Sequence, residues 1–116
     1  MTITKEVLQA TLKKACEKSG AEYFTEEQIY TDSYFVLADG EMIITNDLTQ
    51  SGKVVDAEPI CSARSSGGQM LFVKNPVESE KPVMILTNSK GMAAAPCNFG
   101  NATFEQIVDR FTLMLK

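Results

Sequence analysis

The segment Gln69-Met70-Leu71-Phe72-Val73-Lys74 sets four consecutive apolar residues between two polar ones. A second segment of the same kind, Val83-Met84-Ile85-Leu86, follows a short way along the chain. Strands that are apolar on consecutive positions, rather than on alternate ones, are typical of a sheet that is covered on both faces. The sequence therefore predicts a central sheet that needs cover on two sides.

Further strand candidates surround these two segments. A hairpin is indicated by Tyr34-Phe35-Val36-Leu37 and Met42-Ile43-Ile44, because the Asp39-Gly40 pair between them suits the positive φ angles of a type I′ turn. Other short apolar runs bounded by turn residues lie at 53–57, 60–63 and 92–95. Connections this short exclude helical crossovers between parallel strands, which need about a dozen residues. We therefore expect an antiparallel sheet.

A helix is predicted at each end of the chain. Residues 4–19 place apolar side chains at spacings of three and four, with Thr4 as a candidate N-cap and Gly20 as a left-handed stop. Residues 104–115 form one apolar stripe, preceded by a capping box in which Thr103 and Gln106 satisfy each other's backbone.

These elements predict an α+β fold and a single globular domain over residues 1–116. The expected architecture is a mainly antiparallel, strongly bent sheet or partly closed barrel of about five to seven strands. Closure, the helices or a partner subunit would cover its second face. The order of elements is similar to that of a pleckstrin-homology-like barrel, as a similarity of pattern only.

Composition narrows the class of protein. Of the 116 residues, 44% are hydrophobic and 22% are charged, which is ordinary for a globular chain. Three cysteines at wide spacing favour a reducing compartment over a disulfide framework. No apolar stretch follows a basic start at the N-terminus, and no run approaches the length of a membrane span. We expect a cytoplasmic protein that does not engage membranes.

The chain contains no histidine. This absence excludes the Ser-His-Asp and Cys-His mechanisms and removes the commonest metal ligand. We therefore expect a non-enzymatic protein with neither cofactor nor metal. A cysteine- or carboxylate-dependent enzyme, with Cys97 as its candidate thiol, is the remaining catalytic alternative.

Acidic residues cluster in the first half of the chain. The segment from 22 to 47 has seven of them and no lysine or arginine. They are Glu22, Glu26, Glu27, Asp32, Asp39, Glu41 and Asp47. The acidic character continues to residue 58. Such a surface attracts basic partners and disfavours nucleic acid. The leading hypothesis is a regulator or inhibitor that binds a protein with a basic surface through residues 22–58, although a solvated sheet edge would have the same pattern.

A second hypothesis is a binding protein for a small anionic ligand that contains a phosphate or a nucleotide. The run Arg64-Ser65-Ser66-Gly67-Gly68 could present backbone amides and a guanidinium to an anion, and Asn101 precedes a helix N-terminus. A flexible hairpin tip would have the same composition. Because several strands need cover, a homodimer is a further expectation.

Overall fold

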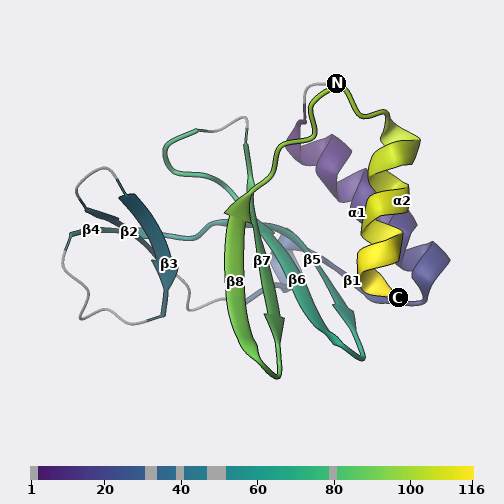
Figure 1. Ribbon diagram of the computed structural model, residues 1–116, viewed down its shortest axis with the longest axis horizontal. Helices are drawn as coiled ribbons and strands as arrows, with labels where there is room; N and C mark the ends of the chain where they lie inside the picture. The colour runs from purple at the N-terminus through teal and green to yellow at the C-terminus, as the bar shows by residue number, and fades with distance from the viewer. Residues whose placement is uncertain (1–2, 31–33, 39–40, 47–51, 79–80) are drawn as a thin grey trace.

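The computed structural model describes residues 3–30, 34–38, 41–46, 52–78 and 81–116. Figure 1 shows a pair of helices, a larger sheet and a smaller sheet. The elements are α1 (Lys5–Ser19), β1 (Glu22–Thr25), the short 3-10 helix η1 (Glu26–Gln28), β2 (Tyr34–Ala38), β3 (Glu41–Thr45), β4 (Lys53–Asp56), β5 (Pro59–Ser65), β6 (Gly68–Val73), β7 (Val83–Asn88), β8 (Gly91–Pro96) and α2 (Phe104–Leu115).

The strands form two sheets, and every pairing is antiparallel. The larger sheet has the order β1-β5-β6-β7-β8, and the smaller has the order β3-β2-β4. The chain leaves the larger sheet after β1, builds the smaller sheet and returns in β5. The predicted α+β class and the antiparallel pairing are confirmed.

The predicted single bent sheet or partly closed barrel of five to seven strands is wrong. Within the described ranges the chain forms eight strands in two separate sheets, and neither sheet is closed or strongly curled. The physical reason is that the second face of the larger sheet gains its cover from another sheet rather than from closure. The strand β1 was also missed, because its four residues include two polar ones and make a weak apolar signal.

Both predicted helices are confirmed, together with their ends. At the start of α1, the Thr4 hydroxyl accepts a hydrogen bond of 3.2 Å from the Val7 amide. Its end is set by Gly20, whose φ of 80° is left-handed. At the start of α2, Thr103 and Gln106 form the expected reciprocal capping box. These local bonds satisfy backbone groups that a helix end would otherwise leave unpaired.

The two helices lie side by side and cover one face of the larger sheet (Figure 1). The centre of this layer is a group of aromatic rings. Phe72 of β6 lies 5.2 Å from Phe111 of α2, and Phe111 makes an edge contact with Phe99 at 5.9 Å between ring centroids. Aromatic pairs of this kind add to the free energy gained from burying their area.

The other face of the larger sheet packs on the smaller sheet. Leu71 and Val73 of β6 point to this side, where they join Val83 and Ile85 of β7 and Phe35 of β2 in a second buried cluster. Alternate residues of β6 therefore belong to two different cores, as successive side chains of a strand must. The prediction that this strand is covered on both faces is confirmed.

No helix among the residues described above is long and apolar enough to cross a membrane.

Replacing Phe111 by alanine should lower the free energy of unfolding by about 3–5 kcal/mol, because it removes two ring contacts and leaves a cavity. Leu113→Ala in the same helix is the matched control, since Leu113 is 72% exposed and should cost less than about 0.5 kcal/mol. Urea denaturation followed by circular dichroism measures both. Equal losses in the two variants would contradict the packing of α2 on the sheet.

Candidate functional site

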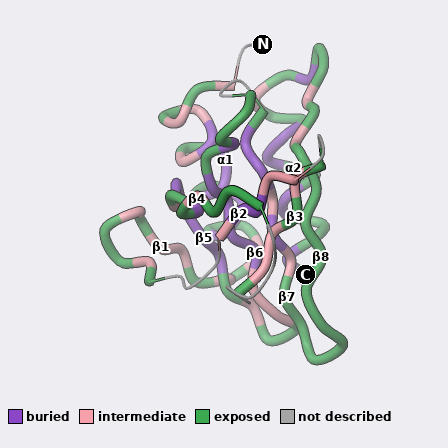
Figure 2. Tube along the Cα trace, turned by 90° about the vertical axis from the view of Figure 1, so that its left-hand side faces the viewer, coloured by how far each residue is buried: buried purple, intermediate pink, exposed green. Residues whose placement is uncertain are grey.

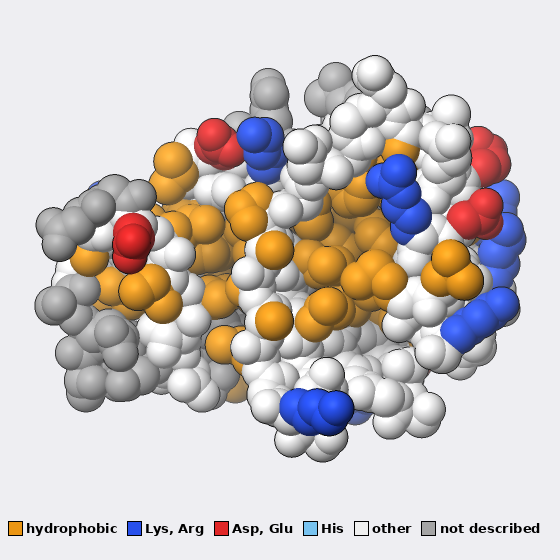
Figure 3. Space-filling view, viewed as in Figure 1, with side chains coloured by type: hydrophobic (Ala, Val, Ile, Leu, Met, Phe, Trp, Pro, Cys, Tyr) orange, Lys and Arg blue, Asp and Glu red, His pale blue; other side chains and the backbone are white. Residues whose placement is uncertain are grey.

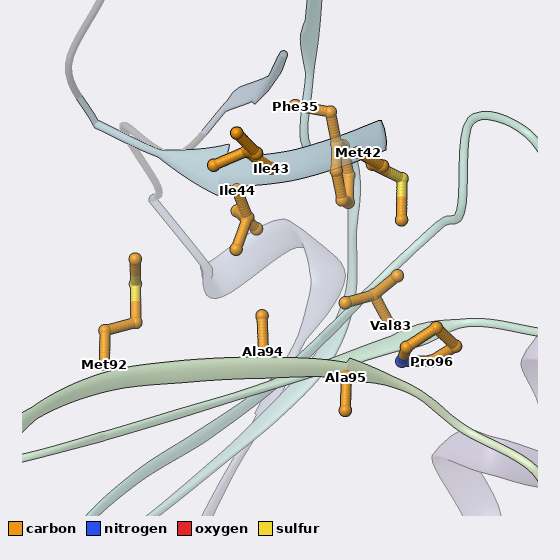
Figure 4. A pocket seen from close by; sticks show the side chains of 9 residues that line it. All are labelled: Phe35, Met42, Ile43, Ile44, Val83, Met92, Ala94, Ala95 and Pro96. Atoms are coloured by element: carbon orange, nitrogen blue, oxygen red, sulfur yellow. The ribbon is translucent and has the colours of Figure 1, made fainter. Parts of the chain in front are cut away.

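A cavity of about 490 Å³ opens between the two sheets, on the side where the larger sheet ends in β8. We call it the intersheet groove. Its lining is Phe35, Met42, Ile43, Ile44, Val83, Met92, Ala94, Ala95 and Pro96. Figure 4 shows how the two walls face each other: Ile44 of β3 and Ala94 of β8 point toward one another, whereas Ala95 points to the opposite face of its strand. The groove therefore lies between β3 and one face of β8.

The chemistry of the lining is uniform. Every described residue that lines the intersheet groove is apolar, so these residues supply no side-chain acid, base or nucleophile. Among the described residues, no three side chains of the metal-binding types lie together. A volume of this size is within the usual range for ligand sites, about 300–1,000 Å³. The size and apolar lining of the groove are suited to binding an apolar group.

Much of this apolar surface faces water. Met92 and Ile43 are each 45% exposed, and all six residues of β8 are exposed. Figure 2 shows β8 in the exposed colour along its length, and Figure 3 shows apolar side chains gathered beside β8 on the viewed face. Folded chains rarely leave a contiguous apolar surface uncovered unless it binds something.

The four acidic residues of the predicted contact set that the structure describes lie on three different elements. Glu22 lies in the edge strand of the larger sheet, and Glu41 lies at the start of β3 in the smaller sheet. Glu26 forms an ion pair with Lys5, whose pKa is raised by that hydrogen bond. Glu27 is exposed in η1. The other predicted contact residues, Asp32, Asp39 and Asp47, lie outside the described residues.

Of the acidic residues that the structure describes, only Glu41 is adjacent in the sequence to a residue that lines the intersheet groove. Glu41 immediately precedes Met42, which lines the groove, and Glu41 is exposed without an ion pair among the described residues. In the sequence, Asp39 and Asp47 stand before and after the same strand. Strand β3 therefore joins an apolar wall to acidic positions.

The run Arg64-Ser65-Ser66-Gly67-Gly68 forms the end of the β5–β6 hairpin, where Ser65 pairs with Gly68. The Arg64 guanidinium lies 5.4 Å from the ring of Phe24, in a cation–π contact. Gly67 and Gly68 border a smaller cavity of about 180 Å³ with the last residues of α2. Because the C-terminal end of a helix has partial negative charge, this position does not favour an anion.

The structure does not bring Asn101 to that hairpin. Asn101 precedes the first turn of α2, whereas the Gly67-Gly68 pair lies against its last turn. Twelve helical residues separate the two, which is about 18 Å along the axis. The residues of the predicted anion site therefore divide between opposite ends of one helix.

The three free cysteines lie in or beside the core under the helices. Burial raises the pKa of Cys16 to about 11 and the pKa of Cys97 to about 12, although a hydrogen bond with the Met84 backbone acts against the second shift. Burial also raises the pKa of Cys61. Tyr23 is shifted the same way, to about 12. A nucleophilic thiol needs the opposite shift, so none of these groups is activated.

Sequence reasoning missed the intersheet groove. Residues 92–95 were recognised as a strand, but their exposure depends on how far the two covering layers extend over the sheet. One usable signal was present: residues 91–104 contain no charged side chain, although the first six of them form an exposed strand.

Comparisons with models of protein families, with curated proteins and with solved structures find no match for this chain. The intersheet groove and the open strand β8 therefore have to be interpreted from their own geometry.

Alanine at Gly68 should destabilise the chain by about 2 kcal/mol or more, through strain and overpacking. Gly68 has a φ of +151°, and a Cβ atom there would lie 2.3 Å from the carbonyl oxygen of Thr87. Gly91→Ala is the matched control, because its φ of +134° is also strained but nothing lies within 4 Å. Urea denaturation compares the two. A similar loss in the free energy of unfolding for both variants would show that the close contact between Gly68 and the neighbouring strand β7 is not what requires a glycine at position 68.

The buried thiols should react slowly with iodoacetamide in the folded protein. Raising the pKa of Cys16 from 9.0 to about 11 reduces its thiolate fraction at neutral pH about a hundredfold. Mass spectrometry should show little alkylation at pH 7 under native conditions and three modified cysteines in denaturant. A cysteine that reacts in the folded protein as fast as a free thiol would support the catalytic alternative.

Proposed function

We propose that this chain is a non-enzymatic protein that acts by protein–protein contact and uses the intersheet groove as its anchor site. The observation that carries the proposal is an open groove whose described lining residues are all apolar, beside an exposed strand. The partner would insert an apolar side chain between β3 and β8. A role as a regulator or inhibitor fits a protein that holds a partner without transforming it.

The charge around the intersheet groove indicates which residues the partner would carry beside its apolar side chain. Interfaces commonly combine an apolar centre with a polar rim, and complementary charge speeds encounter. Glu41 beside the groove, the acidic residues elsewhere in 22–58 and the net charge of −4 favour a partner segment with lysine or arginine next to its apolar anchor. The acidic segment then steers the partner, while the groove retains it.

A small phosphorylated ligand has less support. No basic side chain in the described part of the chain lines the intersheet groove, and the hairpin with Arg64 lies at the C-terminal end of α2, whose partial negative charge does not favour an anion. The absence of basic lining also argues against nucleic acid in the groove. Three free thiols fit a chain that works in a reducing compartment such as the cytoplasm.

Site-specific photocrosslinking tests this proposal. A benzoylphenylalanine at Met92, in the groove, should capture a discrete protein in cells that express the chain. The same residue at Leu113, which is 72% exposed on α2, is the control and should not capture it. The captured protein should then bind the purified chain less tightly when Glu41 is replaced by lysine, since attraction to a basic segment is lost.

Two results would contradict the proposal. Capture of the same proteins from both positions would mean that the groove has no selectivity. If the affinity of the captured protein did not change with Glu41→Lys or with salt, the partner would not be recognised through lysine or arginine. Salt weakens the attraction between exposed charges, so such recognition would depend on it.

A further inference from the structure

The outer edge of β8 is a second open surface, distinct from the groove on its face. β8 is the last strand of the larger sheet, and no strand in the described part of the chain pairs with its outer side. Its register with β7 is continuous from Gly91 to Pro96, without a bulge that would twist the edge away. Open edges of this kind are templates for pairing with another chain.

The ladder with β7 determines which backbone groups point outward. The Cys97 amide donates to the Pro82 carbonyl oxygen at 2.7 Å, so the residue after β8 faces β7. Antiparallel pairs alternate between hydrogen-bonded and non-hydrogen-bonded positions. The amides and carbonyls of Gly91, Ala93 and Ala95 therefore face β7, whereas those of Met92 and Ala94 face outward. Pro96 is the next outward position, and a proline there has no amide to lose.

The edge of β8 lacks the charged residues that protect the other edges. The remaining edge strands each contain a charge: Glu22 in β1, Glu41 in β3, and Lys53 and Asp56 in β4. β8 contains none, and three of its six residues are alanines that hide little of the backbone. Native proteins commonly use charges, bulges or very short strands to prevent edge pairing. Pro96 is one such protective feature at the end of the strand. From Gly91 to Ala95 there is neither a charge nor a bulge, so this part of the edge is free to pair.

We infer that β8 pairs antiparallel with β8 of a second copy of this chain, about a two-fold axis at Ala93. In this register Met92 lies opposite the partner copy's Ala94, so all four outward backbone groups of each copy are satisfied. A shift toward the end of the strand brings Pro96, which has no amide, into the ladder. A shift toward its start brings in Lys90, whose amide already donates to the Asn88 Oδ1 atom at 2.8 Å. The two larger sheets then become one continuous sheet across the dimer.

Charge favours a second copy over a basic partner at this edge. Two copies of a chain with a net charge of −4 repel each other, so they can meet only where the surface is neutral. The exposed and uncharged strand β8 is such a surface. A basic partner would instead be attracted to the acidic positions near β3. The inference goes beyond the proposed function, since the dimer uses the outward backbone groups of β8, whereas the groove uses apolar side chains on one face of that strand.

Cysteine crosslinking tests the register. Two cysteines at position 93 would occupy a non-hydrogen-bonded pair about 4.5 Å apart at Cα, which suits a disulfide. Ala93→Cys should therefore form a covalent dimer under mild oxidation, whereas Ala95→Cys and the unaltered chain should not. A dimer that Ala95→Cys traps as readily would overturn the register.

Sedimentation velocity over a range of concentrations tests the dimer itself. The unaltered chain should dimerise, and Ala94→Pro should weaken the dimer about tenfold or more, because it removes an outward amide from each copy and spares the ladder to β7. Ala93→Lys should also weaken it by opposing two like charges. Ala95→Lys, which would lie opposite Gly91, is the matched control.

A chain that stays monomeric at every concentration would overturn the inference, as would a dimer that persists in both Ala94→Pro and Ala93→Lys. Circular dichroism and thermal melting of each variant confirm that it is folded. The results at Ala93 are independent of the proposed function, because Ala93 does not line the intersheet groove, whereas Ala94 and Ala95 do. A crosslink from Met92 to a second copy of the chain would support the dimer, and a crosslink to a different protein would support the proposed function. Failure of the dimer would thus leave the proposed function standing, and failure of the proposed function would leave the dimer.

Discussion

Four consecutive residues of β6, Met70 to Val73, are buried, and this requires cover on both faces of the larger sheet. The helices supply one cover, where Phe72 meets Phe111. The smaller sheet supplies the other, where Leu71 and Val73 meet Phe35 and its neighbours. Burial of apolar surface dominates the free energy of folding, so the three-layer arrangement follows from this one strand.

The two layers that cover the larger sheet, the helices and the smaller sheet, do not fully cover its last strand, β8. β8 lies outside the area that the helices bury, and the smaller sheet stands over only one of its faces, with the intersheet groove between them. The last strand is therefore open on its face and along its edge. A chain that buries its central strands this thoroughly gains little by leaving such a strand bare, unless other molecules cover it.

Local features of the fold could be predicted from the sequence, because they depend on residues close together. The caps at Thr4 and Thr103, the stop at Gly20 and the antiparallel connections are of this kind. The partly closed barrel was wrong because cover for β6 comes from a sheet inserted between β1 and β5, which no local pattern reveals. Long-range pairing of this kind depends on packing rather than on propensity.

The candidate site could be predicted less well. Acidic residues can be read from a sequence, but their ion pairs cannot. Glu26, for example, forms an ion pair with Lys5, which lies in a different element. Arg64 could be recognised as a candidate anion ligand, but its contact with Phe24 could not. The groove arises where two sheets diverge, so its residues come from segments that are distant in the chain.

Selection of extended peptides from a random library, followed by methyl NMR of the chain with the winning peptide, tests the central claim most directly. The account predicts peptides with an apolar residue flanked by lysine or arginine, which shift the methyl signals of Ile44 and Met92 and leave those of Leu113 unchanged. Peptides that lack this pattern, or shifts confined to the helices, would contradict the assignment of the intersheet groove as the binding site.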